Sequence, residues 1–85
     1  MRWIEDIENE VRNGVRVLAP QPSYRRAFEV GMDICREQHD FTYHQHSQFV
    51  RHASGGFIHL AVTDDDTQGM EYHRLVGSAT SAMRS

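Results

Sequence analysis

The strongest strand signal in the sequence is the run FIHLAV at residues 57–62, which follows the turn signal SGG at residues 54–56. Aromatic and β-branched residues favour strands, and paired glycines favour turns between them. Residues 46–53 and 57–62 are therefore predicted to form a β-hairpin. After Asp40 the apolar residues already follow the two-residue period of a strand, so one or two strands are expected before the turn.

Two helices are predicted before the hairpin. Apolar residues at positions 3, 4, 7 and 11 predict an amphipathic helix that ends at Asn13-Gly14, and residues 15–19 (VRVLA) follow as a short strand. A second helix is expected to begin near Ser23 and to run to about Gln38. Its apolar stripe is Tyr24, Ala27, Phe28, Gly31, Ile34 and Cys35, and the glycine is expected to let a neighbouring element approach closely.

The order of these elements predicts an α/β fold, with a small mixed β-sheet and two helices packed on it. A strand–helix–strand crossover favours parallel pairing, while the hairpin adds antiparallel strands, and a last strand is expected within residues 72–76. Residues 1–77 are predicted to form a single domain, and residues 78–85 a flexible C-terminal tail. Exposed edge strands and the helix that carries Trp3 favour self-association, such as a homodimer.

Composition excludes several classes of function. The net charge of the 85 residues is −3, so no bulk attraction to nucleic acid or to anionic membranes is expected. Apolar runs are too short to span a bilayer, and acidic residues near the start disfavour a signal peptide, which together predict a cytoplasmic protein. All nine basic residues are Arg, which excludes any mechanism that needs a lysine, and the single Cys35 excludes an intrachain disulfide.

Two of the six histidines stand at a spacing that can bind metal. His44 and His46 lie two residues apart on an expected strand, so their side chains would share one face. One interpretation is a divalent metal bound at this pair, in a small metal-dependent enzyme. The other is that both are surface histidines, because no third ligand stands at a diagnostic spacing.

Charged residues suggest two further kinds of site. A nucleic-acid site would use four arginines, Arg25, Arg26, Arg36 and Arg51. The alternative is a solvated helix face on which arginines pair with Glu29 and Asp33. A protein-binding site would use acidic residues that attract a basic partner, namely Glu5, Asp6, Asp64, Asp65 and Asp66. The alternative for the aspartates is a solvated turn.

Four stretches occur in an order that resembles part of the RecA-like motor domain of phage terminase large subunits and related helicases. They are GVRVLAP (14–20), YRRAF (24–28), SGGFIHL (54–60) and QGMEYHRLVG (68–77). The resemblance implies a fragment of a RecA-like fold. The nucleotide-binding loop with its lysine is absent, however, and Ser78-Ala79 stands where the family has the Asp-Glu pair that holds magnesium. The resemblance therefore implies a fragment without ATPase activity.

These observations predict a small, non-enzymatic interaction protein without a cofactor. The expected partner is another protein, and the resemblance suggests a phage-encoded protein that binds or inhibits a component of a DNA-processing or host-defence machine. The alternatives are a nucleic-acid-binding module that uses the Arg25-Arg26 region and the metal-dependent enzyme centred on His44 and His46.

Overall fold

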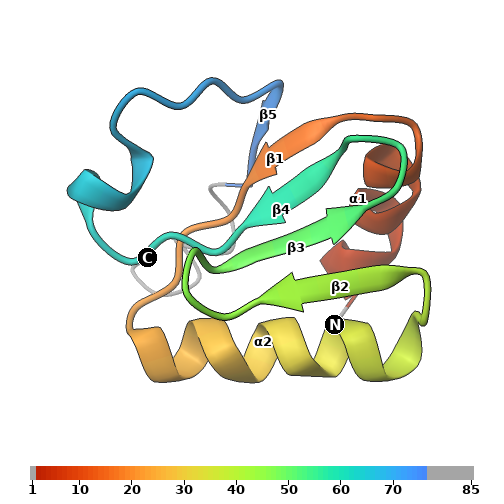
Figure 1. Cartoon of the computed structure of the whole chain (residues 1–85), viewed down its shortest axis with the longest axis horizontal. Coiled ribbons are helices and arrows are strands. Elements are labelled where there is room, and N and C mark those ends of the chain that lie inside the picture. The colour runs from red at the N-terminus through yellow and green to blue at the C-terminus, as the bar shows by residue number, and fades with distance from the viewer. Residues whose placement is uncertain (1, 77–85) are drawn as a thin grey trace.

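The computed structural model of the chain describes residues 2–76 and contains the elements in the predicted order (Figure 1). The elements are α1 (Arg2–Arg12), β1 (Arg16–Leu18), α2 (Tyr24–Glu37), β2 (Phe41–His44), β3 (Phe49–His52), β4 (Phe57–His59), the 3₁₀-helix η1 (Asp64–Thr67) and β5 (Arg74–Leu75). The tail that was predicted for residues 78–85 lies outside the described residues. No helix in residues 2–76 is long and apolar enough to cross a membrane.

The five strands form one mixed sheet in the order β2-β3-β4-β1-β5. β1 pairs in parallel with β4 and β5, and α2 lies on the crossover that connects β1 to the rest of the sheet. The pairs β2–β3 and β3–β4 are antiparallel. The small mixed α/β sheet with two helices is therefore confirmed.

The strand predicted at residues 57–62 is shorter in the structure, since β4 ends at His59. Beyond that point the backbone bonds to loops instead of to a strand ladder. The Leu60 amide donates to the Gln48 carbonyl at 2.9 Å, and the Ala61 carbonyl accepts from the Gln21 amide at 2.7 Å. The apolar run thus continues as buried loop, where its backbone groups are still paired.

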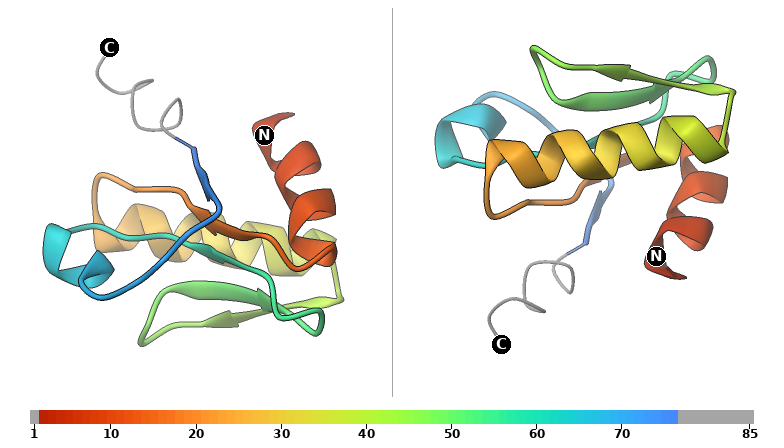
Figure 2. Two further views of the ribbon diagram at one scale, coloured as in Figure 1. Left: turned by 90° about the horizontal axis from the view of Figure 1, so that it is seen from above. Right: turned by 90° about the horizontal axis from the view of Figure 1, so that it is seen from below.

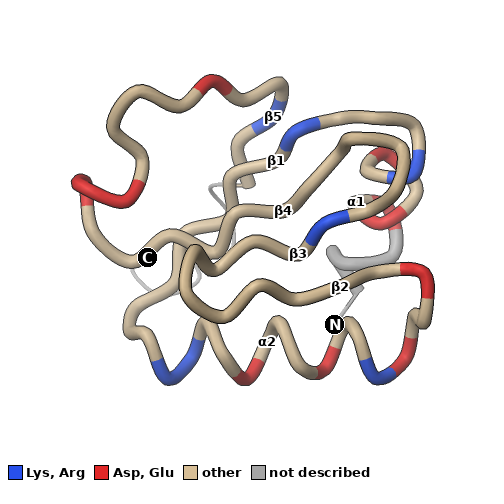
Figure 3. Tube along the Cα trace, viewed as in Figure 1, with Lys and Arg blue, Asp and Glu red and all other residues tan. Residues whose placement is uncertain are grey.

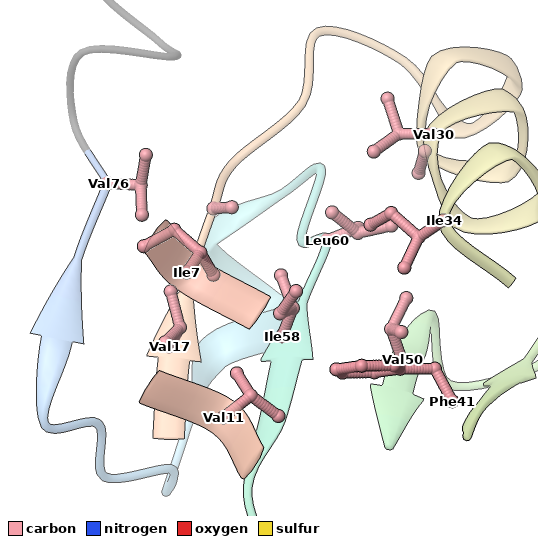
Figure 4. Packing of buried hydrophobic residues seen from close by; sticks show 12 residues of the cluster. Ile7, Val11, Val17, Val30, Ile34, Phe41, Val50, Ile58, Leu60 and Val76 are labelled. Carbon is pink, nitrogen blue, oxygen red and sulfur yellow. The ribbon is translucent and has the colours of Figure 1, made fainter. Parts of the chain in front are cut away.

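Both helices cover the same face of the sheet. The strand register aligns Val17, Ile58 and Val50 side by side on that face. Helix α1 packs on these residues through apolar side chains, α2 does the same, and all of them belong to one buried cluster (Figure 4). The two helices contribute Ile7, Val11, Val30 and Ile34. Figure 2 shows that the axis of α2 runs along the strands, whereas the axis of α1 is steeply inclined to them.

Aromatic side chains occupy the opposite face of the sheet. Phe49, Phe57 and His59 alternate with the core residues along β3 and β4, and all three are buried. The segment between η1 and β5 covers them, because the Tyr72 ring lies against both Phe57 and His59. The sheet is therefore packed on both faces, by helices on one and by a loop on the other.

Local geometry explains where α2 begins and how it approaches the sheet. The Ser23 hydroxyl accepts a hydrogen bond from the Arg26 amide at 3.1 Å, so Ser23 is the N-cap of the helix. A Cβ on Gly31 would lie 2.5 Å from the Tyr43 ring, so the predicted close approach is also confirmed. Gly56 is similarly enclosed, because a Cβ there would meet the backbone carbonyls of Val11 and Val15.

Candidate functional site

Helix α2 carries an exposed apolar stripe. Tyr24 is 55% exposed, and Phe28 and Met32 are each 40% exposed. The spacing of four residues places these side chains one above another on a single flank of the helix. Two of them, Tyr24 and Phe28, were expected within the buried stripe, and the structure places them outside it. Ala27, Gly31 and Ile34 of the predicted stripe are buried, and Val30, which was not part of it, is buried with them.

Helix α2 runs beside β2, which is the outermost strand of the sheet (Figure 1). The stripe reaches this strand through Phe28. The rings of Phe28 and Tyr43 meet edge to face, with 6.1 Å between their centroids. The helix side chains therefore continue onto the strand without a polar boundary. We call the exposed stripe of Tyr24, Phe28 and Met32, together with Tyr43 and the free edge of β2, the α2–β2 surface.

An open hollow of about 360 Å³ lies within this surface. It is lined by Tyr24, Arg25, Phe28, Tyr43, Gln45 and Gln48. Its wall thus combines three aromatic rings with one guanidinium and two amide side chains, a mixture that suits contact with another polypeptide.

Gln48 holds the turn that forms one side of the hollow. It is 7% exposed and has φ 62, a left-handed conformation that non-glycine residues rarely adopt. Its amide nitrogen donates to the His44 carbonyl at 2.7 Å, and its side-chain amide donates to the Leu60 carbonyl at 3.4 Å. These bonds tie the β2–β3 turn to the end of β4, so the hollow has a fixed wall.

The outer edge of β2 presents backbone groups of Tyr43. Backbone N–H and C=O groups in an antiparallel strand point alternately to the two sides. The Phe41 amide donates to the Gln38 carbonyl at 3.2 Å and not to β3. By this alternation, Thr42 and His44 bond to β3, and the N–H and C=O of Tyr43 point to the free side.

The four arginines proposed for nucleic acid do not gather on one face (Figure 3). Arg25 and Arg26 lie in the first turn of α2 and both approach Glu29, at 3.5 and 3.2 Å. Arg36, in the last turn, pairs with Asp33 at 3.0 Å. Arg51 lies on the other face of the sheet, where its guanidinium stands 4.9 Å from the centre of the Phe49 ring. The arrangement matches the alternative of a helix face with paired charges.

The histidine pair is not placed as the metal interpretation required. His44 is the last residue of β2, and His46 lies in the turn that follows, so the expectation that both stand on a strand is wrong for His46. The strand ends there because the turn is closed by the bond from Gln48 to His44. Both histidines are exposed, and within residues 2–76 no three His, Cys, Asp or Glu residues are grouped so that they could hold a metal ion.

The acidic candidates lie at opposite ends of the molecule, on α1 and on η1 (Figure 3). Asp6, Asp64 and Asp65 are exposed, whereas the side chain of Glu5 lies outside the described part of the structure. Asp66 has a structural role, because its carboxylate accepts from the amides of Val62 and Thr63 at 2.9 and 3.0 Å. These hydrogen bonds lower the pKa of Asp66.

A buried polar pair was not found by sequence reasoning. His59 is 3% exposed, and its Nδ1 lies 2.6 Å from the Tyr72 hydroxyl. Burial lowers the pKa of His59, so the ring is neutral near pH 7 and its Nδ1 can accept a hydrogen bond from the Tyr72 hydroxyl. The pair fastens the segment between η1 and β5 to the sheet. The alternation of His59 with Ile58 and Leu60 was the available signal, but it does not show that both faces are covered.

Cys35 also has a structural environment. It is half-buried against the core, and burial raises the pKa of its thiol. A raised pKa reduces the fraction of thiolate, which is the reactive form. This agrees with the interpretation of Cys35 as part of the packing.

Comparison of the chain with protein-family models, with characterised proteins and with solved structures finds no match. The resemblance to the motor domain of phage terminases therefore stays a prediction.

Proposed function

We propose that this protein is a non-enzymatic interaction module that binds another protein chain at the α2–β2 surface. The observation that carries the proposal is the exposed stripe of Tyr24, Phe28 and Met32 beside an open sheet edge. Contiguous exposed apolar patches on small proteins mark interaction sites, and an unpaired strand edge offers backbone hydrogen bonds to a partner.

The chemistry of the surface supports a polypeptide partner. Tyrosine, phenylalanine and methionine are enriched in protein interfaces, and methionine adapts its shape to the side chains that it meets. The hollow beside the stripe can receive an apolar side chain of the partner, while Arg25 and Gln45 at its wall offer hydrogen-bond donors.

The ionisable groups with shifted pKa values support a non-catalytic role. Asp40 bonds to Arg12, Asp66 holds the start of η1, and His59 bonds to Tyr72. None of these three lines the hollow; Tyr43 does, and burial raises the pKa of its phenol, so the hydroxyl keeps its proton. Perturbed groups in a catalytic site would be expected to converge on one cleft. The further expectation that the partner belongs to a DNA-processing or host-defence machine rests on the order of sequence motifs alone.

Photo-crosslinking tests the proposal. A photoreactive phenylalanine analogue is placed at Phe28, and in a matched control at Leu75, which is 63% exposed at the opposite edge of the sheet. We expect protein crosslinks from position 28 that disappear when Met32→Glu is added, and none of the same species from position 75. Equal crosslinking from both positions, or crosslinks that depend on nucleic acid, would overturn the proposal.

A further inference from the structure

We infer that the chain which docks on the α2–β2 surface is a second copy of this protein. In this arrangement the two β2 strands pair antiparallel across a two-fold axis, and two five-stranded sheets join into one. The inference rests on the proposed function and names the partner for that surface. Three features of the surface make it complementary to itself: the strand edge, the position of α2 over the sheet, and the charges along α2.

The free edge of β2 fits an antiparallel copy. A two-fold axis perpendicular to a sheet relates two strands antiparallel, which is the geometry of an interface that uses the same patch on both subunits. Because the N–H and C=O of Tyr43 point to the free side, a pair of Tyr43 residues at the axis would exchange two hydrogen bonds. The Phe41 amide is already bonded to Gln38, so the pairing is short and centred on Tyr43.

Helix α2 is positioned to meet its own copy. It packs against β2 and β3, and adjacent strands are about 4.8 Å apart. Two α2 helices on the same face of a continuous sheet, each over its own β2–β3 pair, would therefore lie about 10 Å apart, which is a normal distance for packed helices. The flank of α2 that would face the copy is the one that carries the exposed stripe.

The side chains match along this contact. Phe28 touches Tyr43, so it would lie near the axis. In an antiparallel pair of helices, Tyr24 of one copy would lie beside the second half of the other, where Met32 stands. Tyr24 and Met32, the two ends of the stripe, would thereby cover each other, and the apolar surface would be buried on both copies.

The charges beside the stripe favour a copy over an acidic or a basic partner. The exposed flank of α2 carries two arginines and two carboxylates, so its charge sums to zero (Arg25, Glu29, Asp33, Arg36). A surface built for a highly charged partner would carry an excess of the opposite sign. Arg25 is 88% exposed and only loosely paired with Glu29, at 3.5 Å. In the antiparallel arrangement it would approach Asp33 of the second copy.

Sedimentation of the full chain over a wide concentration range tests the inference. We expect a species of twice the 9.8 kDa chain mass at high concentration. Met32→Glu should raise the dissociation constant at least tenfold, because it places a carboxylate from each copy in the apolar contact. The matched control, Leu75→Glu at the opposite edge, should leave the dissociation constant unchanged. Circular dichroism establishes that each variant is folded before it is compared.

A charge exchange gives a second, independent readout. Arg25→Asp and Asp33→Arg should each weaken the dimer, and the two changes together should restore part of the lost affinity. A dimer that is sensitive to Leu75→Glu and not to Met32→Glu would overturn the inference. A monomer at every concentration would also overturn it. If position 28 then still crosslinks to a different protein, the proposed function stands, and if it crosslinks to nothing, both fail.

Discussion

Replacing Gly31 with alanine should destabilise this protein, although the same change stabilises most helices. In an exposed helix interior, alanine is favoured over glycine by about 1 kcal/mol. Here the added Cβ would stand 2.5 Å from two ring atoms of Tyr43 and 2.9 Å from a third. Carbon atoms normally approach to about 3.5–4.0 Å, so the ring has to move by about 1 Å or more.

The size of the effect follows from two opposing contributions. Overpacking of this kind costs about 1–3 kcal/mol, against the gain in helix propensity of about 1 kcal/mol. The ring cannot move without disturbing its edge-to-face contact with Phe28. We therefore expect a net loss of about 1 kcal/mol, which lowers the Tm of a domain of this size by about 4–8 °C.

A double-mutant cycle with Tyr43→Ala isolates the contact. In the Tyr43→Ala background the obstacle is absent, so Gly31→Ala should raise the free energy of unfolding by about 1 kcal/mol, and the coupling energy should be about 2 kcal/mol. The assay is urea unfolding monitored by circular dichroism at a protein concentration low enough to keep every variant monomeric. If Gly31→Ala stabilises the wild-type protein as much as it stabilises Tyr43→Ala, the close approach of α2 to β2 is refuted.

Three further predictions concern stability. Arg12 donates hydrogen bonds to the carboxylate of Asp40 and holds the pKa of Asp40 at about 2. The stability that this ion pair contributes should therefore be lost as pH falls from about 4 towards 2, and Arg12→Gln should flatten this loss in acid unfolding curves. Burial lowers the pKa of His59 below 6.5, so the unfolded chain binds a proton at this residue more readily than the folded protein does. The free energy of unfolding should therefore fall as pH drops below 6.5, and His59→Gln should reduce this dependence. Gly56→Ala should lower the free energy of unfolding by more than about 2 kcal/mol, because the added Cβ would collide with backbone carbonyls. Gly55→Ala places its Cβ in open space and should lower it by about 1 kcal/mol, because the left-handed φ of +97 disfavours a side chain.

Each of these predictions has a result that contradicts it. Acid unfolding curves that coincide for wild type and Arg12→Gln would show that the ion pair does not set the pKa of Asp40. Stability that is constant between pH 7 and pH 5 would contradict a neutral, buried His59. Equal Tm values for the Gly55 and Gly56 variants would mean that Gly56 is not enclosed by the backbone.

The order of the elements could be read from the sequence because the signals are local. Apolar spacing identifies α1, Ser23 supplies a capping hydroxyl to the next helix, and glycines mark the turn before β4. Each signal depends on a few neighbouring residues, and the mixed sheet follows from their order. The length of β4 could not be read in the same way. Residues 60–62 are as apolar as the strand, and only their hydrogen-bond partners distinguish loop from ladder.

The candidate sites were less predictable because they depend on distance in space. Four arginines that look alike in sequence are separated by the fold, and three of them pair with carboxylates on their own helix. His46 lies in a turn and not on the strand of His44. The contact of His59 with Tyr72 joins two segments whose relation no local pattern reveals.

By itself, the sequence determined that residues 2–76 form two α-helices and a small mixed sheet, and that the chain, which has no lysine, lacks every lysine-dependent chemistry. It did not determine which apolar side chains of α2 stay exposed. The apolar arc of that helix is wider than the strip that the sheet can cover, so packing selects Ala27, Val30 and Ile34 for the core and leaves Tyr24 and Phe28 outside. Tertiary structure alone decides that choice, because it sets how the helix is rotated over the sheet and which strand ends as the free edge beside it.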